Sequence, residues 1–418
     1  MRKLFYWAFA FSLCVLMGCK DDGVRVEVVR YAINEPVFMS ISEFRNSVKV
    51  TDEVVPITKR GKICFYKDYL YISSPDKGIH IVDNRNPASP RIAGFVELIG
   101  NEDLSIKDDK LYADSYVDLV WFDISDPERP ELEGRVENAF RYALPTIENG
   151  YGFDYNMCYS GEAKGVVVGW EPKEREETIY HYPSYGGDLM ANDAAPGTST
   201  QGVNGSMARF SIYGKYLYTV EQNVMCVFDL SGDKPVLTTN DIWLQRDVET
   251  LFNYKDKMFM GTPTGMLIYS LEDPLAPKYR SSVSHVFGCD PVVVEDDLAY
   301  VTVHSGNTCG QNTNELMLID VSDVDQPNLL VTYGMKCPKG LGIDNGTLFL
   351  CDEGLKVFNA KDPMTLMANQ LVHYAGMEGY DVIPFKNTLM MIADDGLYQY
   401  DYSNLQAISQ LSKLPMGE

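Results

Sequence analysis

The sequence predicts an all-β protein, a single β-propeller built from four-stranded blades. Three observations predict it: a strand motif recurs along the chain, the spacing between copies is nearly constant, and prolines follow many of the copies. Four short strands in about 40 residues is the period of a propeller blade. A β-helix would need far shorter repeats, and a helical solenoid would need a 3.6-residue periodicity, which is absent.

Each repeat consists of a tyrosine-rich strand, a loop and an apolar strand. Two copies show the unit, because Lys67–Ile72 precedes Gly78–Asp83, and Lys107–Ala113 precedes Val117–Ser125. Proline cannot donate to a ladder, so the prolines after each apolar strand mark where the chain leaves the sheet. Most copies are 39 to 42 residues apart, with one spacing of 50. The later copies centre on Val224–Asp229, Met266–Ser270, Leu316–Asp320, Leu355–Asn359 and Leu397–Asp401.

One interval in the series is too long for a single blade. From Asp123 to Asp229 there are 106 residues, and this interval contains the turn-rich Leu144–Asp154 and the apolar Gly165–Trp170. We therefore expect a degenerate eighth blade here, followed by a loop at about residues 183–204. Seven blades with a large insertion is the alternative.

The two ends of the propeller must meet to close the ring. We expect the final strand, at about residues 405–414, to pair with residues 63–66, because closure leaves no sheet edge exposed. The expected organisation is a signal peptide at 1–18, a tether and N-terminal extension at 19–55, and the propeller at 56–418.

The first residues predict export. Arg2 and Lys3 precede the apolar run Leu4–Met17, which is about 21 Å long as a helix and is shorter than the roughly 20 residues that span a bilayer. The run ends at Leu16–Cys19, which resembles a bacterial lipobox. The resemblance implies cleavage before Cys19 and lipidation of that residue, whereas an ordinary signal peptide is the alternative.

The residues after the lipobox bear on where the protein is displayed. Lys20–Asp22 is similar to the acidic export tag of surface lipoproteins from Bacteroidetes, and a solvated linker is the alternative. A diacylglyceryl cysteine supplies the two acyl chains that stable anchoring requires. The resemblance implies a lipid-anchored protein of the outer membrane, exposed on the cell surface.

The charge of the exported chain limits its partners. Without Arg2 and Lys3 it holds 34 basic and 59 acidic residues, a net charge of −25. Such a surface repels nucleic acid and anionic headgroups, so we expect no nucleic-acid partner. The expected partners are the membrane, through the lipid anchor, and a glycan, a peptide or another envelope protein.

The repeats also resemble the LVIVD repeat of bacterial and archaeal surface proteins. Ile79–Asp83 with Asn86–Pro90 carries the resemblance best, and Asp123–Pro127 is second. The similarity covers roughly residues 60–403. It implies a propeller displayed outside the cell, and it implies no particular chemistry.

Four acidic residues mark a candidate ligand site on the face that carries the longer loops. Asp103, Glu249, Asp290 and Asp381 each follow a long loop and begin a strand. Near the axis they would form a ring whose repulsion a shared cation or a hydrogen-bonding ligand would relieve. The alternative is that they accept hydrogen bonds from backbone in turns. Together with His304, these are the candidate ligand-binding residues.

The cysteines divide into two groups. Cys64 and Cys226 lie in apolar strands and are expected to be buried free thiols. The other group lies in or beside the long-loop face and comprises Cys158, Cys289, Cys309, Cys337 and Cys351. An oxidising compartment favours a disulfide there, and we expect it between Cys309 and either Cys289 or Cys337.

A zinc site built from His285, Cys289, His304 and Cys309 is a less favoured alternative, because their spacing matches no compact finger pattern. We therefore expect no metal and no cofactor.

Sequence signatures of catalysis are absent. The chain has no His-Glu-x-x-His, no Gly-x-Ser-x-Gly and no P-loop, and it holds only five histidines. We therefore predict a non-catalytic binding or scaffold module. The alternative is a polysaccharide-processing enzyme that uses carboxylates and a histidine, for which Asp290, Tyr300 and His304 would be the best residues.

Overall fold

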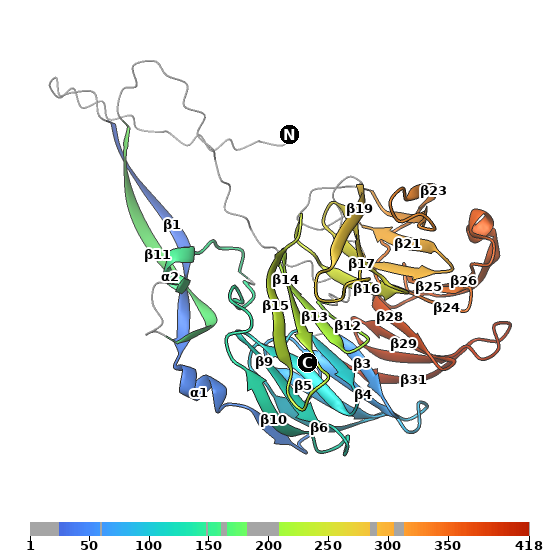
Figure 1. Ribbon diagram of the computed structural model, residues 1–418, viewed down its shortest axis with the longest axis horizontal. Coiled ribbons are helices and arrows are strands. Elements are labelled where there is room, and N and C mark those ends of the chain that lie inside the picture. The colour runs from blue at the N-terminus through green and yellow to red at the C-terminus, as the bar shows by residue number, and fades with distance from the viewer. Residues whose placement is uncertain are drawn as a thin grey trace, which may run out of the picture.

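The computed structural model describes residues 25–58, 61–147, 149–159, 165–181, 209–284, 291–304 and 313–417. Within them the chain forms seven antiparallel sheets arranged as the blades of a propeller, together with a separate two-stranded ribbon (Figure 1). The expected β-propeller is confirmed. The expected eight blades are not, because the ring has seven.

The four strands of each blade occupy successive positions from the axis outward. The innermost strands contact one another around the ring: β3 (Ile63–Tyr66), β7 (Leu104–Lys107), β12 (Phe210–Tyr213), β16 (Thr250–Tyr254), β20 (Val292–Glu295), β24 (Leu341–Asp344) and β28 (Gly379–Phe385). The second strands are β4 (Tyr69–Ser74), β8 (Lys110–Ser115), β13 (Tyr216–Glu221), β17 (Lys257–Thr262), β21 (Leu298–Val303), β25 (Thr347–Cys351) and β29 (Thr388–Ala393).

The outer half of each blade follows the same order. The third strands are β5 (Gly78–Asp83), β9 (Asp118–Asp123), β14 (Val224–Asp229), β18 (Gly265–Ser270), β22 (Glu315–Asp320), β26 (Leu355–Asn359) and β30 (Gly396–Asp401). The outermost strands are β6 (Arg91–Glu97), β10 (Glu131–Val136), β15 (Val236–Trp243), β19 (Lys278–Ser284), β23 (Asn328–Gly334), β27 (Gln370–Tyr374) and β31 (Ser409–Pro415). A short helix η1 (Pro363–Asn369) precedes β27.

The middle strands are apolar on both faces because a neighbouring blade covers each face. All six residues of β4 and of β5 are buried, whereas burial along β15 alternates between half-buried and exposed. Buried clusters accordingly combine side chains of adjacent blades, such as Ile81 of β5 with Leu111 of β8. The continuous apolar runs in the sequence are therefore middle strands, and the alternating ones are outer strands.

The turn between the first and second strands has a fixed chemistry. Asp108 and Asp109 both have positive φ, at 49° and 59°, and so do Asp296 and Asp297, at 51° and 61°. Two central residues with positive φ match the type I′ hairpin turn, for which Asp, Asn and Gly are favoured.

The corner after each third strand explains why the repeat ends in Asp, Asn or Ser. In every blade this side chain accepts a hydrogen bond from the backbone N–H two residues later, an Asx-type turn. The bonds measure 2.7–3.3 Å and run from Arg85 to Asp83, Ser125 to Asp123, Ser231 to Asp229, Glu272 to Ser270, Ser322 to Asp320, Lys361 to Asn359 and Ser403 to Asp401.

The corner bonds also change the acidity of these carboxylates. Hydrogen bonds from the following serine lower the pKa of Asp123, Asp320 and Asp401, and they lower the pKa of Asp229 to about 2. The last residue of the repeat is thus conformational in role, because it holds the corner at which the chain leaves the sheet.

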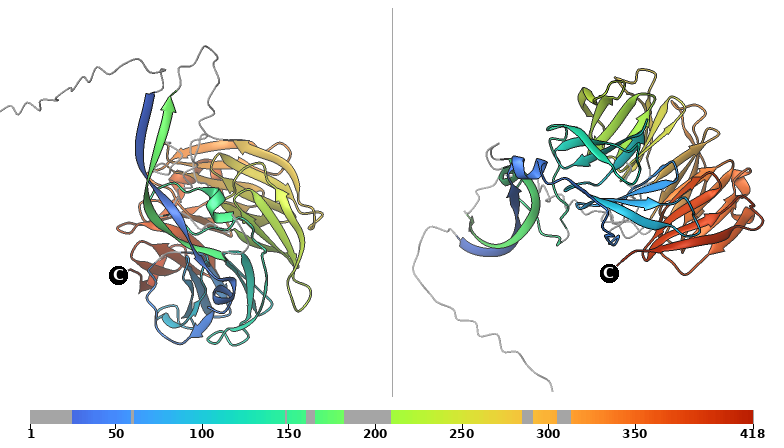
Figure 2. Two further views of the ribbon diagram at one scale, coloured as in Figure 1. Left: turned by 90° about the vertical axis from the view of Figure 1, so that its left-hand side faces the viewer. Right: turned by 90° about the horizontal axis from the view of Figure 1, so that it is seen from below.

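The ring closes without an exchanged strand, so the expected pairing of the final strand was wrong. β31 pairs with β30 of its own blade, and β3 pairs with β4. The first and last blades instead meet through an apolar cluster that includes Leu70, Ile72, Met390 and Ile392 (Figure 2). The ring is therefore closed by side-chain packing between the first and last blades, and not by the expected pairing of backbone strands.

One buried polar pair crosses the same closure. The amides of Asn84 and Gln399 exchange two hydrogen bonds of 3.0 and 2.7 Å, and Gln399 is fully buried. Near them Ser412 donates to the carbonyl of Pro87. Because each amide satisfies the other, the pair fixes the register of the first blade against the last.

The described parts of the long interval after the second blade, residues 137–147, 149–159 and 165–181, form no eighth blade. The apolar strand of this interval belongs to β11 (Val166–His181), which pairs antiparallel with β1 (Arg25–Met39) over 15 residue pairs. The two strands form a ribbon that projects beside the ring (Figures 1 and 2). The alternative of seven blades with an insertion is therefore correct, and the loop expected at residues 183–204 lies outside the described residues.

From residue 25 onward, the N-terminal extension forms defined elements and docks on the second blade. After β1 it forms the helix α1 (Ile41–Arg45) and then β2 (Lys49–Thr51), which adds a fifth strand to the first blade beside β6. Phe44 is buried against Tyr116, and the guanidinium of Arg45 pairs with the enclosed carboxylate of Asp118 at 2.9 Å. A second helix, α2 (Tyr155–Tyr159), lies against the ribbon.

The closure makes a testable prediction. Gln399→Leu should lower the free energy of unfolding by about 1–3 kcal/mol, because it leaves the buried Asn84 amide without its partner. The double variant with Asn84→Leu should recover part of the loss, because two apolar side chains no longer leave a polar group unpaired. Denaturant titration of the wild type, of the single variants Gln399→Leu and Asn84→Leu, and of the double variant measures both effects. A double variant at least as unstable as the sum of the two single variants would contradict the closure.

Candidate functional site

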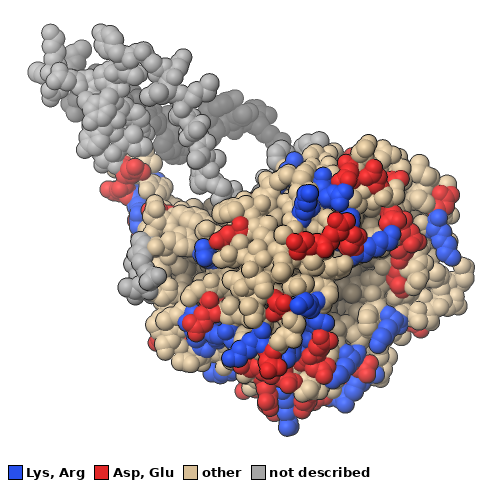
Figure 3. All heavy atoms as spheres, in the orientation of Figure 1, with Lys and Arg blue, Asp and Glu red and all other residues tan. Residues whose placement is uncertain are grey.

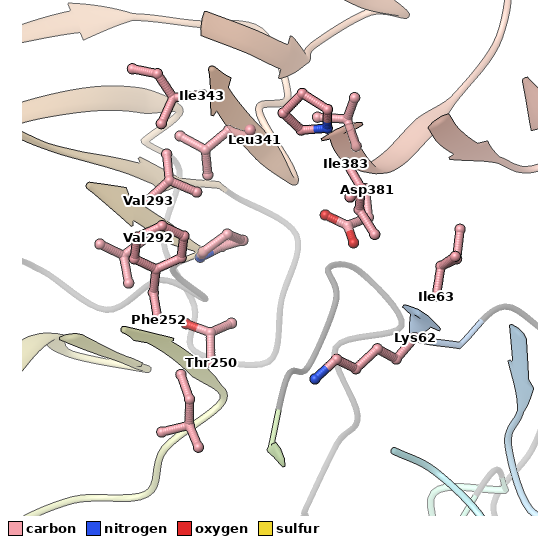
Figure 4. A pocket seen from close by; sticks show the side chains of 15 residues that line it. Lys62, Ile63, Thr250, Phe252, Val292, Val293, Leu341, Ile343, Asp381 and Ile383 are labelled. Atoms are coloured by element: carbon pink, nitrogen blue, oxygen red, sulfur yellow. The ribbon is translucent and has the colours of Figure 1, made fainter. Parts of the chain in front are cut away.

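A cavity on the propeller axis is lined by five of the innermost strands and the residues next to them, namely β3, β16, β20, β24 and β28. It encloses about 290 Å³ and its wall is mostly apolar, with side chains such as Val292, Leu341 and Ile383. Two charged side chains, those of Lys62 and Asp381, also line it (Figure 4). The axis is thus an apolar chamber with one cation and one carboxylate, and Asp381 is a sequence-predicted residue that does lie there.

Charges of both signs precede the innermost strands. Lys62, Asp103, Arg209 and Glu249 each directly precede the first residue of an innermost strand. The predicted ring of acids is therefore interrupted by cations in the first and third blades. Sequence reasoning considered only the acids, and comparing all the repeats at this one position would have revealed the two basic residues.

Asp103 joins the first three blades. Its Oδ1 accepts from the backbone N–H of Leu104 at 2.7 Å and lies 3.2 Å from the ammonium of Lys62. Its Oδ2 accepts from the backbone N–H groups of Arg209 and Phe210. Burial raises the pKa of this carboxyl group, and the two cations oppose that shift. Asp103 is buried and both of its oxygens accept hydrogen bonds from backbone N–H groups, which is the structural role given above as the alternative to ligand binding.

Arg209 holds a second buried carboxylate beside it. Its guanidinium lies 3.3 Å from Asp114 and also pairs with Glu102. The other oxygen of Asp114 accepts from the backbone N–H groups of Glu102 and Asp103, at 2.7 and 3.0 Å. Protein donors engage the carboxylates of Glu102, Asp103 and Asp114, so these three acids stabilise the contacts between the blades.

Glu221, at the end of β13, is the least compensated acid of this cluster. Its carboxylate accepts one hydrogen bond, of 3.3 Å, from the backbone N–H of Tyr142. Burial raises the pKa of Glu221 to about 7, although the charge of Arg209 opposes the shift. This group was not among the residues that the sequence indicated.

The remaining candidate residues are separated. Glu249 is half-buried and its backbone N–H donates to Gly261, whereas His304 is buried just after β21. Asp290 lies outside the described residues. Among the predicted acids, Asp381 lines the axial cavity, whereas Asp103 is buried before β7 and bonds to groups of the first and third blades.

The cysteines that the structure describes are free thiols. Burial raises the pKa of Cys64 to about 12, and Cys226 is buried, in agreement with the expected free thiols. Cys337 is exposed, while Cys289 and Cys309 lie outside the described residues, so the disulfide stays a prediction. His285, one of the possible zinc ligands, also lies outside them.

Two searches of the described residues bear on cofactors and membranes. Nowhere in these ranges do three His, Cys, Asp or Glu side chains come together in a way that could hold a metal ion. The helices described here are too short to cross a bilayer. On the face shown in Figure 3, acidic and basic side chains intermingle and do not form separate patches.

The fold defines the class of this protein, a seven-bladed β-propeller. It carries LVIVD repeats, because the model of that repeat matches residues 61–97, 102–138 and 290–334. These segments correspond to the first, second and fifth blades. The other blades share the architecture without matching the model. No curated protein sequence matches the chain.

Solved structures share the fold at low sequence identity. The periplasmic gluconolactonase PpgL of Pseudomonas aeruginosa has a TM-score of 0.52 and 11% identity, covering 88% of this chain and 97% of its own. The computationally designed protein Ika8 has a TM-score of 0.50 and 11% identity, covering 86% of this chain and 87% of its own. At such identity the likeness concerns the fold alone.

The raised pKa of Glu221 predicts a pH-dependent stability. A folded-state pKa above the ordinary value of 4.5 gives stability that is fully present below about pH 4.5 and lost as the pH rises through 7. Glu221→Gln mimics the neutral form, so its Tm should lie close to that of the wild type at pH 4 and exceed it at pH 8.5 by roughly 2 °C or more.

Thermal melts at the two pH values, with Glu131→Gln at an exposed position as the control, measure this difference. An equal effect of Glu221→Gln at both pH values would contradict the burial of an uncompensated carboxyl group.

Proposed function

We propose that the protein is a lipid-anchored binding or scaffold module, which holds a non-catalytic propeller at a distance from the outer membrane. The observation that carries the proposal is the ribbon. β1 begins at Arg25, six residues after the predicted lipidation site Cys19, so the ribbon would start close to the bilayer.

The ribbon has the dimensions and the bonding of a spacer. Fifteen residues of β1 extend for about 50 Å in a strand. Cross-strand ion pairs join Arg30 to Glu176 and Glu35 to Arg175. The Trp170 indole donates to the carbonyl of Pro145 at 2.7 Å, which ties the ribbon to the segment leading from the second blade. A paired ribbon bends less than a single tethering strand, so it would restrict how the propeller faces its surroundings.

Binding is favoured over catalysis by the way the acids are used. The carboxylate oxygens of Asp103 and Asp114 accept hydrogen bonds from backbone N–H groups and form ion pairs with Lys62 and Arg209. A general acid or base needs a carboxyl group within reach of a ligand proton. The LVIVD repeats support display outside the cell, and the likeness to a gluconolactonase supports the fold but no lactone chemistry.

Retention without turnover is the result that would support a binding module. A soluble form beginning at residue 20 would be passed over immobilised polysaccharides and peptides and, in parallel, incubated with the same polysaccharides. We expect retention on at least one material and no new soluble products. Release of soluble oligosaccharides would contradict the non-catalytic function and favour the polysaccharide-processing alternative.

Anchoring predicts a clear effect of one substitution. Cys19→Ala should move the protein from the membrane fraction to the soluble fraction, because the lipid on this residue is the proposed anchor. Cys14→Ala, within the apolar run of the signal peptide, is the matched control and should leave the protein with the membrane. Fractionation and immunoblotting measure both. A Cys19→Ala protein that still sediments quantitatively with membranes would show that the anchor lies elsewhere.

A further inference from the structure

A groove runs between the third and fourth blades on the outside of the propeller. It encloses about 720 Å³, within the range of pockets that hold small organic ligands. One side is formed by Ile242 and Trp243 at the end of β15, and the other by residues of β18, of β19 and of the corner between them, including Tyr269 and Tyr279. β15 and the β18–β19 pair belong to neighbouring blades (Figure 1).

Trp243 distinguishes this groove from the equivalent places in the other blades. Its side chain is 62% exposed, whereas Trp121 is buried and Trp170 is half-buried. Trp243 pairs with the first residue of the third strand of its blade. In five other blades the residue in the matching pair is Glu97, Ser284, Gly334, Tyr374 or Pro415. In the second blade the outer strand ends at Val136, which pairs with Leu119.

The indole of Trp243 is supported from outside the groove. The ring of Tyr142 lies 6.5 Å from it at an interplanar angle of 54°, and Tyr142 does not line the groove. The backbone of Tyr142 is itself fixed, because its N–H donates to Glu221 and its carbonyl accepts from the hydroxyl of Tyr159. An exposed aromatic face on a fixed support is suited to a ligand that stacks on it.

The rest of the wall supplies polar groups around an aromatic base. Tyr269 and Tyr279 make an edge contact at 5.7 Å, and Gln245 brings an amide that can donate and accept. Two acids, Glu272 and Asp273, and two cations, Lys278 and Arg280, line the groove, so its formal charges balance. The guanidinium of Arg280 is held by Asp325 at 2.7 Å. The groove therefore offers an aromatic ring for stacking and polar groups that can bond to the hydroxyl groups of a ligand, and its formal charges balance.

We propose that this groove binds an uncharged oligosaccharide, with one sugar ring stacked on Trp243. The C–H groups on one face of a sugar ring carry slight positive charge, which suits the negative face of an aromatic ring. Hydroxyl groups around the ring match the amide and the carboxylates of the wall. A glycan rich in carboxylates is disfavoured by the chain's net charge of −23. The proposal rests on the binding function above, and it names the ligand class and the place.

The test uses the soluble form beginning at residue 20 and a panel of defined neutral and uronate-containing oligosaccharides. Titration calorimetry of the wild type should detect a neutral oligosaccharide that binds. Trp243→Ala should weaken that binding about tenfold or more, and Trp243→Phe should retain part of it, because a ring remains. Tyr151→Ala removes another exposed aromatic side chain, away from the groove, and should change nothing. Since Trp243 is exposed, the melting temperature of each variant should stay that of the wild type.

The possible failures are distinguishable. If a neutral oligosaccharide binds the wild type and Trp243→Ala equally well, the groove is not the binding site, but the proposed binding function still holds. Binding of uronate-containing oligosaccharides alone, or of none in the panel, would overturn the ligand class, and retention on immobilised peptides would then still support the binding function. Turnover of a neutral oligosaccharide that depends on Trp243 would support the groove and overturn the non-catalytic function.

Discussion

The structure depends on covering both faces of every blade. The second and third strands are apolar on both faces, so each blade requires a neighbouring blade on each side. A row of such blades leaves no apolar face exposed to water when its first and last blades pack together. In this chain the closure between the first and last blades is made by an apolar cluster around Leu70 and Met390 and by the reciprocal amides of Asn84 and Gln399. No strand is exchanged between the two ends.

This form of closure leaves the N-terminal segment available for another role. Apart from the short β2 at the edge of the first blade, residues 25–51 do not take part in the ring's sheets. They pair with the insertion after the second blade and dock through Phe44 and Arg45. Because the ring is complete without β1, this strand is available to pair with β11. The resulting ribbon is the proposed spacer between the propeller and a membrane.

The sequence predicted what local chemistry determines. The recurring blade strands were predicted from runs of neighbouring residues. The type I′ turns and Asx corners are equally local, as at Asp108 with Asp109 and at Asp123 with Ser125, but their conformations come from the structure. What depended on distant pairing could not be predicted in this way: β11 has the apolar start of a blade strand, and its partner lies more than 100 residues earlier. Four acids were predicted as one set, but of these Asp381 lines the axial cavity and Asp103 is bound by Lys62 and Arg209, two cations from other repeats. Trp243 was not predicted as a site residue, because the exposure of its side chain depends on how the third and fourth blades pack and cannot be inferred from neighbouring residues.

The central claim is that the N-terminal segment and the insertion form one ribbon on a ring that is complete without it. Hydrogen–deuterium exchange on the whole chain, compared with a variant that lacks residues 166–181, tests it most directly. We predict that the amides of β1 are protected in the whole chain and exchange as an unpaired strand in the deletion variant, while the innermost strands keep their protection in both. Protection of β1 that survives the deletion, or loss of protection throughout the blades, would contradict the account.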